Sequence, residues 1–263
     1  MYTKETLIKD IEKLGLKKDC TVLIHSSYKS IGDVDGRADT VLDAFIEYMK
    51  DGLLAFPTHS WNTVNSEHPN FYLNETKVCI GILPELFRQR PNVLRSIHPT
   101  HSVSAIGKNA YEFIKDDVDA ETPCGINSTW HKMYEYYGYI IFLGAKMTTN
   151  TFIHGVEEWV GIPDRLSENK VDFQIHLPGK EVYTKAVHTH RSSFGDVSSV
   201  YDKLKEPLIY LNIAKEGKIG DATTVLCDAR KMCDFTTDML KIKPNLFGDK
   251  ELIPKEWYEN LKY

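Results

Sequence analysis

Residues Thr21–Pro57 read TVLIHSSYKSIGDVDGRADTVLDAFIEYMKDGLLAFP and contain a strand, a loop, a helix and a second strand in that order. The apolar run Thr21–His25 is typical of a buried strand, and a serine-rich loop follows it. Residues 40–50 place apolar side chains at helical spacing, and the strand at 53–56 ends at a proline. A strand, a crossover helix and a second strand favour parallel pairing, so the sequence predicts a layered α/β fold with ligands at the carboxyl ends of its strands.

The rest of the chain continues this mixture of helices and strands. Further helices are expected at 3–14, 81–90, 108–115, 129–136, 198–213 and 228–240, further strands at 139–143 and 223–226, and two short β pieces between 95 and 106. Apolar and polar side chains alternate between 171 and 187 on both sides of a Pro-Gly turn, which predicts an antiparallel hairpin. No repeat or linker divides the chain. We therefore expect one domain, residues 1–263, a three-layer α/β/α arrangement around a mixed, partly parallel sheet with the hairpin in its C-terminal half.

Composition limits the classes of function. The chain has 263 residues, 42% of them apolar, and a formal net charge of −5 without a long basic run, so nucleic acid and anionic membrane surfaces are disfavoured partners. A cationic small molecule fits this charge better. No stretch reaches the roughly 18 apolar residues of a membrane span, and the five scattered cysteines form no Cys-x-x-Cys pair. These features predict a cytoplasmic protein with reduced thiols, and a homodimer is compatible with them.

The segment Tyr139–Trp159, YIIFLGAKMTTNTFIHGVEEW, suggests catalysis. An apolar strand ends at a glycine, and the following Thr-x-x-His-x-x-Glu pattern would place His154 and Glu157 on one face of a helix. A neutral imidazole oriented by a carboxylate is a suitable general base for removing a proton. A surface or core hydrogen-bonded pair would have the same spacing. Zinc is disfavoured, because the segment lacks the second histidine of either His-Glu-x-x-His or His-x-x-Glu-His.

Two other polar segments follow predicted strands. The loop from Ser26 to Gly32 carries small hydroxyl residues and Lys29, which could hydrogen-bond a phosphate or an amide-rich arm, although a serine-capped turn has the same composition. His98-Pro99-Thr100-His101-Ser102 could be a metal pair, a turn with incidental histidines or a loop that faces a ligand. A metal would need a third ligand that the sequence does not assign.

Taken in order, short motifs across nearly the whole chain resemble those of the aminoglycoside N3-acetyltransferase family, also called the antibiotic N-acetyltransferases. They are His25-Ser26-Ser27 with Ser30-Ile31-Gly32, Pro57-Thr58 with Ser60-Trp61, Arg95-Ser96-x-His98-Pro99-x-x-Ser102-Val103, Pro123-x-Gly125 with Ser128, Leu143-Gly144, Asn150-Thr151-x-x-His154-x-x-Glu157, and Gly217-Lys218-Ile219-Gly220. The resemblance implies transfer of an acetyl group from the cosubstrate acetyl-CoA to an amine, without a covalent acyl-enzyme and without a metal. The expected acceptor is the 3-amino group of the 2-deoxystreptamine ring of an aminoglycoside, or a related small amine.

The resemblance also implies roles for individual residues. His154 is the expected general base and Glu157 the acidic residue beside it. The expected cofactor-binding residues are Ser26, Ser27, Tyr28, Lys29, Ser30, Ile31, Gly32, His98, Ser102 and Val103. A polycationic amine needs opposite charge nearby, and the long polar stretch 58–77 could reach over the site. The residues expected to bind the acceptor are therefore Trp61, Glu67, Glu158 and Asp164.

Two departures leave alternatives open. The stretch between the Pro57-Thr58 motif and residue 81 is shorter and less acidic than in several resistance enzymes of the family, so the acceptor does not follow from the resemblance alone. Cys124 lies in Thr122-Pro123-Cys124-Gly125 and could be a thiol nucleophile, although a free cysteine is more often a small buried apolar side chain. The alternative functions are a metal-dependent hydrolase using His98, His101, His188 and His190, and a non-catalytic CoA or ligand binder on the same fold.

Overall fold

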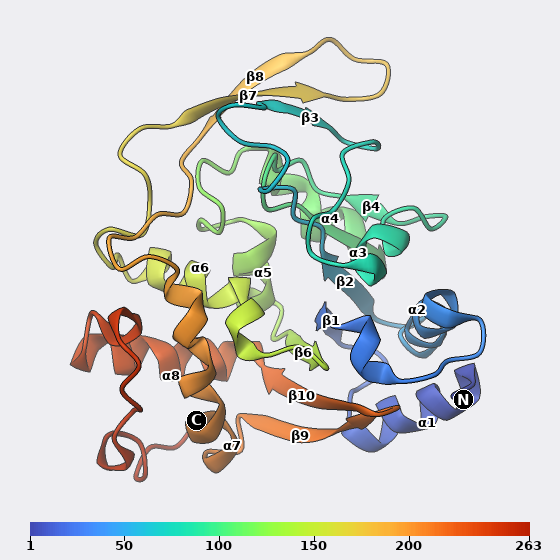
Figure 1. Ribbon diagram of the computed structural model, residues 1–263, viewed down its shortest axis with the longest axis vertical. Coiled ribbons are helices and arrows are strands. Elements are labelled where there is room, and N and C mark those ends of the chain that lie inside the picture. The colour runs from blue at the N-terminus through green and yellow to red at the C-terminus, as the bar shows by residue number, and fades with distance from the viewer.

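The computed structural model describes all 263 residues, and a seven-stranded sheet runs through its centre (Figure 1). The sheet has the order β4-β5-β2-β1-β6-β10-β9, in which β1 lies parallel to both β2 and β6 and every other pair is antiparallel. A second sheet has the order β3-β7-β8 and lies at the top of Figure 1. The strands are β1 (Thr21–Ser26), β2 (Leu53–Pro57), β3 (Asn70–Tyr72), β4 (Leu94–Arg95), β5 (Val103–Gly107), β6 (Tyr139–Leu143), β7 (Val171–His176), β8 (Tyr183–Val187), β9 (Ala214–Ile219) and β10 (Ala222–Asp228).

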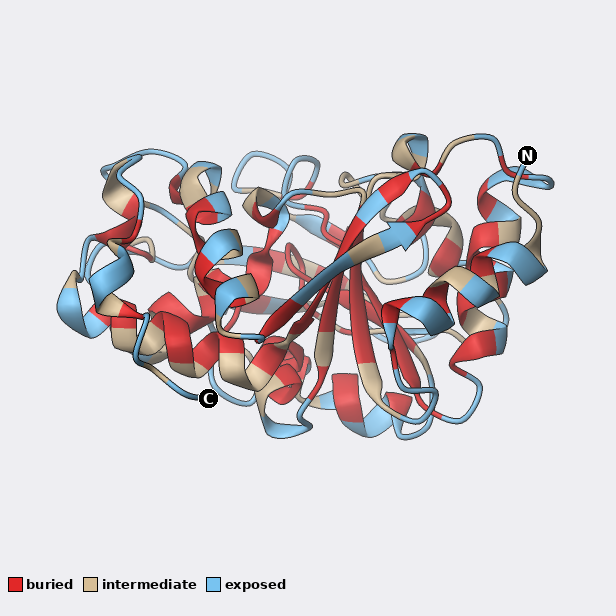
Figure 2. Cartoon of the chain, turned by 90° about the horizontal axis from the view of Figure 1, so that it is seen from below, coloured by how far each residue is buried: buried red, intermediate tan, exposed pale blue.

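Both faces of the main sheet are apolar, and helices cover each of them. Successive side chains of a strand point to opposite faces, so in β1 Leu23 belongs to one core and its neighbours Val22 and Ile24 to the other. The first core packs under α4 (Ala110–Ile114), α5 (Thr129–Glu135), α6 (Thr151–Trp159), α7 (Lys205–Tyr210) and α8 (Ala229–Ile242), and the second under α1 (Lys4–Leu14), α2 (Arg37–Tyr48) and α3 (Ile82–Phe87). Figure 2 shows the buried strands between these helices. The predicted three-layer α/β/α arrangement is confirmed.

The predicted hairpin is present as β7 and β8, which pair antiparallel. It belongs to the second sheet, where β3 adds a parallel strand from the stretch 58–77. Strands β3 and β9 are not predicted from the sequence. The expected helix 198–213 is also two elements, the 3₁₀ helix η4 (Val197–Leu204) and then α7. Pro207 lies in the first turn of α7, because a proline has no N–H to continue a preceding helix.

The carboxyl ends of β1, β2 and β6 lie at one edge of the main sheet, because these three strands run in the same direction. The serine-rich loop, with its 3₁₀ helix η1 (Tyr28–Ile31), and the stretch 58–77 begin at this edge. The segment that leads into α6 follows β6 there. None of the helices combines the length and the apolar character that crossing a membrane requires.

Candidate active site

A cavity of about 730 Å³ opens at the carboxyl ends of the parallel strands. Its wall is formed by the ends of β1 and β2, the stretch 58–77, residues 148–154 and the segment 189–198 that leads into η4. Ligands gather at this edge in α/β sheets. Five histidines line the cavity, which are His25, His59, His101, His154 and His190.

His154 lies on α6, and a tyrosine hydroxyl connects it to a carboxylate. Nδ1 of His154 lies 2.9 Å from the hydroxyl of Tyr201, and that hydroxyl donates to Oε2 of Glu157 at 2.6 Å. The direct distance from His154 Nδ1 to Glu157 Oε2 is 3.9 Å, too long for a hydrogen bond. A tyrosine hydroxyl has one proton, which goes to the carboxylate, so the hydroxyl must accept from Nδ1–H. This assigns the neutral tautomer of His154 with Nε2 free to take a proton.

The Glu157 carboxylate also forms an ion pair with Arg165. Glu157 is fully buried and accepts from Nε of Arg165, which is almost fully buried as well. Burial raises the pKa of Glu157, and the bonds from Tyr201 and Arg165 oppose that rise. Burial, with the nearby His190, His59 and Arg165, lowers the pKa of His154 well below its ordinary value. His154 is therefore neutral at physiological pH, the form that a general base requires.

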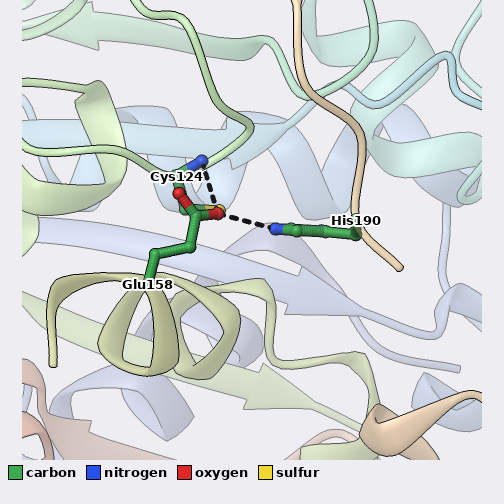
Figure 3. Close-up of side chains that lie close together, drawn as sticks. All are labelled: Cys124, Glu158 and His190. Atoms are coloured by element: carbon green, nitrogen blue, oxygen red, sulfur yellow. Dashed lines mark hydrogen bonds and ion pairs between the residues drawn. The ribbon is translucent and has the colours of Figure 1, made fainter. Parts of the chain in front are cut away.

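A second histidine and carboxylate pair lies beside the first. Nε2 of His190 lies 2.8 Å from Oε1 of Glu158, which also accepts from the backbone N–H of Cys124 at 3.2 Å (Figure 3). The rings of His190 and His154 stack with centroids 4.4 Å apart. Glu157 and Glu158, which are adjacent on α6, thus contact two neighbouring imidazoles: Glu157 contacts His154 through Tyr201, and Glu158 contacts His190 directly. Glu158 was expected to bind the acceptor, but its side chain is buried and paired with His190.

The thiol of Cys124 is fully buried and does not line the cavity. Burial and the charges of Glu158 and Asp117 raise its pKa well above the ordinary value, so it stays protonated. One ligand atom each from Cys124, Glu158 and His190 lies within 4.8 Å of the others, a spacing that could hold a metal ion.

The four histidines of the hydrolase alternative do not converge in this way, and His190 is the only one of them in this group. His98 is bonded to the carbonyl of Thr122, and His188 to the carbonyl of Ser167.

Of the ten residues predicted to bind the cofactor, Ser26 lines the cavity. Ser102 and Val103 are fully buried, and the hydroxyl of Ser102 donates to the carbonyl of Thr58 and accepts from Arg95. His98 and Ile31 are buried too. The serine-rich loop follows β1, and residues 98–103 lead into β5 at the same edge of the sheet. Strand β2 separates the two segments, because β5 pairs with β2 and not with β1.

Hydrogen bonds within the serine-rich loop and to the end of β6 fix its conformation. The backbone N–H of Ser27 donates to the carbonyl of Leu143, and the hydroxyl oxygen of Ser30 lies 3.1 Å from that of Ser27 and 3.3 Å from the carbonyl oxygen of Gly144. Gly32 has φ +90°, a conformation that favours glycine, and a Cβ there would collide with the carboxylate of Asp221. Gly32 is thus required by the fold itself. Tyr28 and Lys29 lie in η1.

Among the residues expected to bind the acceptor, Trp61 lines the cavity with 48% of its surface exposed. Glu67 and Asp164 are exposed and are not part of the lining, and the carboxylate of Asp164 accepts from the backbone N–H of Ser193. Tyr201 and Arg165 were not identified from the sequence. Neither has a spacing relative to His154 that a helix or strand would explain, so no sequence signal pointed to them.

Comparisons with known proteins place these features in a family. Residues 23–241 match the family described as aminoglycoside 3-N-acetyltransferase. The chain is 28% identical over 264 residues to the SPbeta prophage-derived aminoglycoside N(3')-acetyltransferase-like protein YokD of Bacillus subtilis (strain 168), covering 89% of this chain and 90% of YokD.

Two solved structures share the fold. AAC-IIIb in a binary complex with CoASH has a TM-score of 0.81 at 22% identity, covering 92% of this chain and 97% of that one. A mutant of AAC(3)-IVa in complex with a gentamicin also has a TM-score of 0.81, at 23% identity, covering 97% of this chain and 93% of that one. From the family match over most of its length, the chain belongs to the aminoglycoside 3-N-acetyltransferase family of enzymes.

Proposed function

We propose that this protein transfers the acetyl group of acetyl-CoA to the amine of a small molecule, with His154 as the general base. The observation that carries the proposal is the chain of contacts from Arg165 through Glu157 and Tyr201 to His154. It fixes the tautomer of the imidazole, and burial keeps the imidazole neutral. Family membership and the CoASH complex of AAC-IIIb support acetyl-CoA as the donor.

The reaction that suits this arrangement is direct transfer. The amine nitrogen attacks the thioester carbonyl, and Nε2 of His154 takes the proton that the nitrogen loses. The C–N bond forms as the C–S bond breaks, and coenzyme A leaves as the thiolate, which then takes up a proton. As positive charge develops on the imidazole, the Tyr201 hydroxyl and the Glu157 carboxylate stabilise it through Nδ1. Arg165 compensates the charge of Glu157 between turnovers.

A covalent acetyl-cysteine route has less support. The backbone N–H of Cys124 donates to Glu158, but the Cys124 thiol is fully buried, protonated and outside the cavity lining. Thiolate formation there would place a second negative charge beside Glu158.

The test is release of coenzyme A from acetyl-CoA in the presence of a panel of small amines. General-base assistance contributes about 10²–10⁴ in rate, so His154→Ala should lower kcat by that factor while acetyl-CoA binds with nearly unchanged affinity. Cys124→Ala should stay within a few-fold of the parent rate. If Cys124→Ala abolished transfer and His154→Ala spared it, a covalent route would replace this mechanism.

A further inference from the structure

The cavity contains little negative charge. Among its lining residues Asp196 is the one carboxylate, whereas two lining residues, Arg165 and Arg191, carry guanidinium groups. The histidines add no charge where burial keeps them neutral, as it does for His59, His101 and His154, whose pKa values lie well below the ordinary value.

The single lining carboxylate is already engaged. Asp196 is the N-cap of η4, and its Oδ1 accepts from the backbone N–H of Ser198 at 3.0 Å and from the hydroxyl of the same residue at 2.6 Å. Asp196 can attract one ammonium group, but no second carboxylate lines the cavity beside it.

The four other carboxylates expected at the site do not supply more. Glu157 is neutralised by Arg165, and Glu158 is buried against His190. Glu67 and Asp164 lie outside the lining. A molecule with several ammonium groups would therefore leave most of them without a partner, and desolvating unpaired charge is costly.

The positive groups are better placed to receive a ligand. Nη2 of Arg165 is buried without a hydrogen-bond partner, and the side chain is only 3% exposed. Arg191 is 55% exposed, and its one ion pair, with Glu168, spans 3.6 Å to a carboxylate that is itself 84% exposed. Exposed pairs of this kind contribute about 0–1 kcal/mol, so Arg191 can readily exchange this partner for a ligand.

Resting on the proposed acetyl transfer, we infer that the acceptor is a small amine that also carries a carboxylate or a phosphate, and not a polycation. One amino group of the acceptor contacts Asp196 and the base His154. The anionic group contacts Arg191 and the unpaired Nη2 of Arg165. Carboxylate and phosphate both suit a guanidinium group, so the chemistry they share defines the acceptor class.

Three pyranoses with the same C2 amine separate the charges: glucosamine, its 6-carboxylate 2-amino-2-deoxyglucuronate, and glucosamine 6-phosphate. Gentamicin serves as the polycation. The inference predicts that kcat/KM for at least one anionic acceptor exceeds the values for glucosamine and gentamicin by about tenfold or more, because hydrogen bonds to charged groups are the strong ones. The preferred anionic acceptor shows whether the site binds a carboxylate or a phosphate. Salt should lower this kcat/KM more steeply than that for glucosamine, which lacks the charged contact with Arg191.

Arg191→Gln tests the assignment of the anion site. It should lower kcat/KM for the preferred anionic acceptor about tenfold more than for glucosamine, mainly through KM. Arg230→Gln on α8 is the matched control, because Arg230 packs on Tyr134 and Tyr137 and does not line the cavity.

A calorimetric measurement of acceptor binding to His154→Ala gives the same ranking without turnover. Release of coenzyme A fastest with gentamicin, or equal values for glucosamine and both anions, would overturn the inference and leave acetyl transfer intact. Failure of all four acceptors to bind would also overturn it. Absence of both acetyl-CoA binding and coenzyme A release would instead remove the proposed function on which it rests.

Discussion

Replacing Tyr201 by phenylalanine would remove one oxygen atom from the centre of the candidate site. That oxygen lies 2.9 Å from His154 Nδ1 and 2.6 Å from Glu157 Oε2, and without it the imidazole and the carboxylate are 3.9 Å apart with nothing between them. Nδ1–H would lose its acceptor, and Glu157 would lose one of its two donors. Hydrogen bonds to charged groups contribute about 1.5–3 kcal/mol, so kcat should fall about 10- to 100-fold.

The assay is kcat for coenzyme A release, together with the affinity for acetyl-CoA by calorimetry, which should stay unchanged. Tyr183→Phe is the matched control, since the Tyr183 hydroxyl is also buried but has no hydrogen-bond partner and does not line the cavity. A Tyr201→Phe enzyme that keeps kcat within twofold of the parent, with a similar melting temperature, would refute the role given to the hydroxyl. A loss equal to that of Tyr183→Phe would do the same.

Three further results are expected. Burial lowers the pKa of His25 and of His98 to about 3, so below pH 6.5 the unfolded chain binds protons that the folded protein does not; the free energy of unfolding should fall from pH 6.5 towards pH 3, by up to about 1.4 kcal/mol per pH unit for each histidine. Denaturant titrations at pH 7.5 and 5.5 that give equal values would contradict this. Arg165→Gln leaves the buried Glu157 charge uncompensated and should cost about 3–5 kcal/mol of stability in urea unfolding, whereas a loss under 1 kcal/mol would mean that the pair is not closed off from water. Cys124→Ala should cost about 1 kcal/mol of stability, read from its melting temperature, because it leaves a small void in a packed core.

The elements that the sequence predicts well are those whose pattern reflects burial on the main sheet. β1, β2 and β6 are continuous apolar runs, since both of their faces are covered, and such runs stand out in any sequence. β9 does not stand out, because only its end residues Ala214 and Ile219 are buried. Its pairing with β10 depends on the two-residue turn Gly220-Asp221, whose Gly-Asp sequence is typical of a tight hairpin.

The candidate site was predictable only in part. Helical spacing correctly placed His154 and Glu157 on one face of α6, but it could not show that a third side chain lies between them. Tyr201 reaches His154 because η4 packs against α6, a contact of tertiary structure that no local pattern encodes. The partners of Glu157 and Glu158 were hidden for a similar reason: Arg165 and His190 lie outside α6, so helical spacing could not identify them.

The strand order of the main sheet has a consequence for how the enzyme is made. Next to β1 lie β2, which follows it directly, and β6, which emerges only after residue 139. Contacts between such distant segments form late, because the chain must first close a long loop. His154 and Glu157 on α6 follow β6 in the chain, and Tyr201 follows α6, so the contacts among these three residues can form only after all of them have been synthesised. Tyr201 lies about three quarters of the way along the 263 residues, so at least that much of the chain must leave the ribosome before an active molecule can assemble. Refolding should restore activity no earlier than the pairing of β1 with β6.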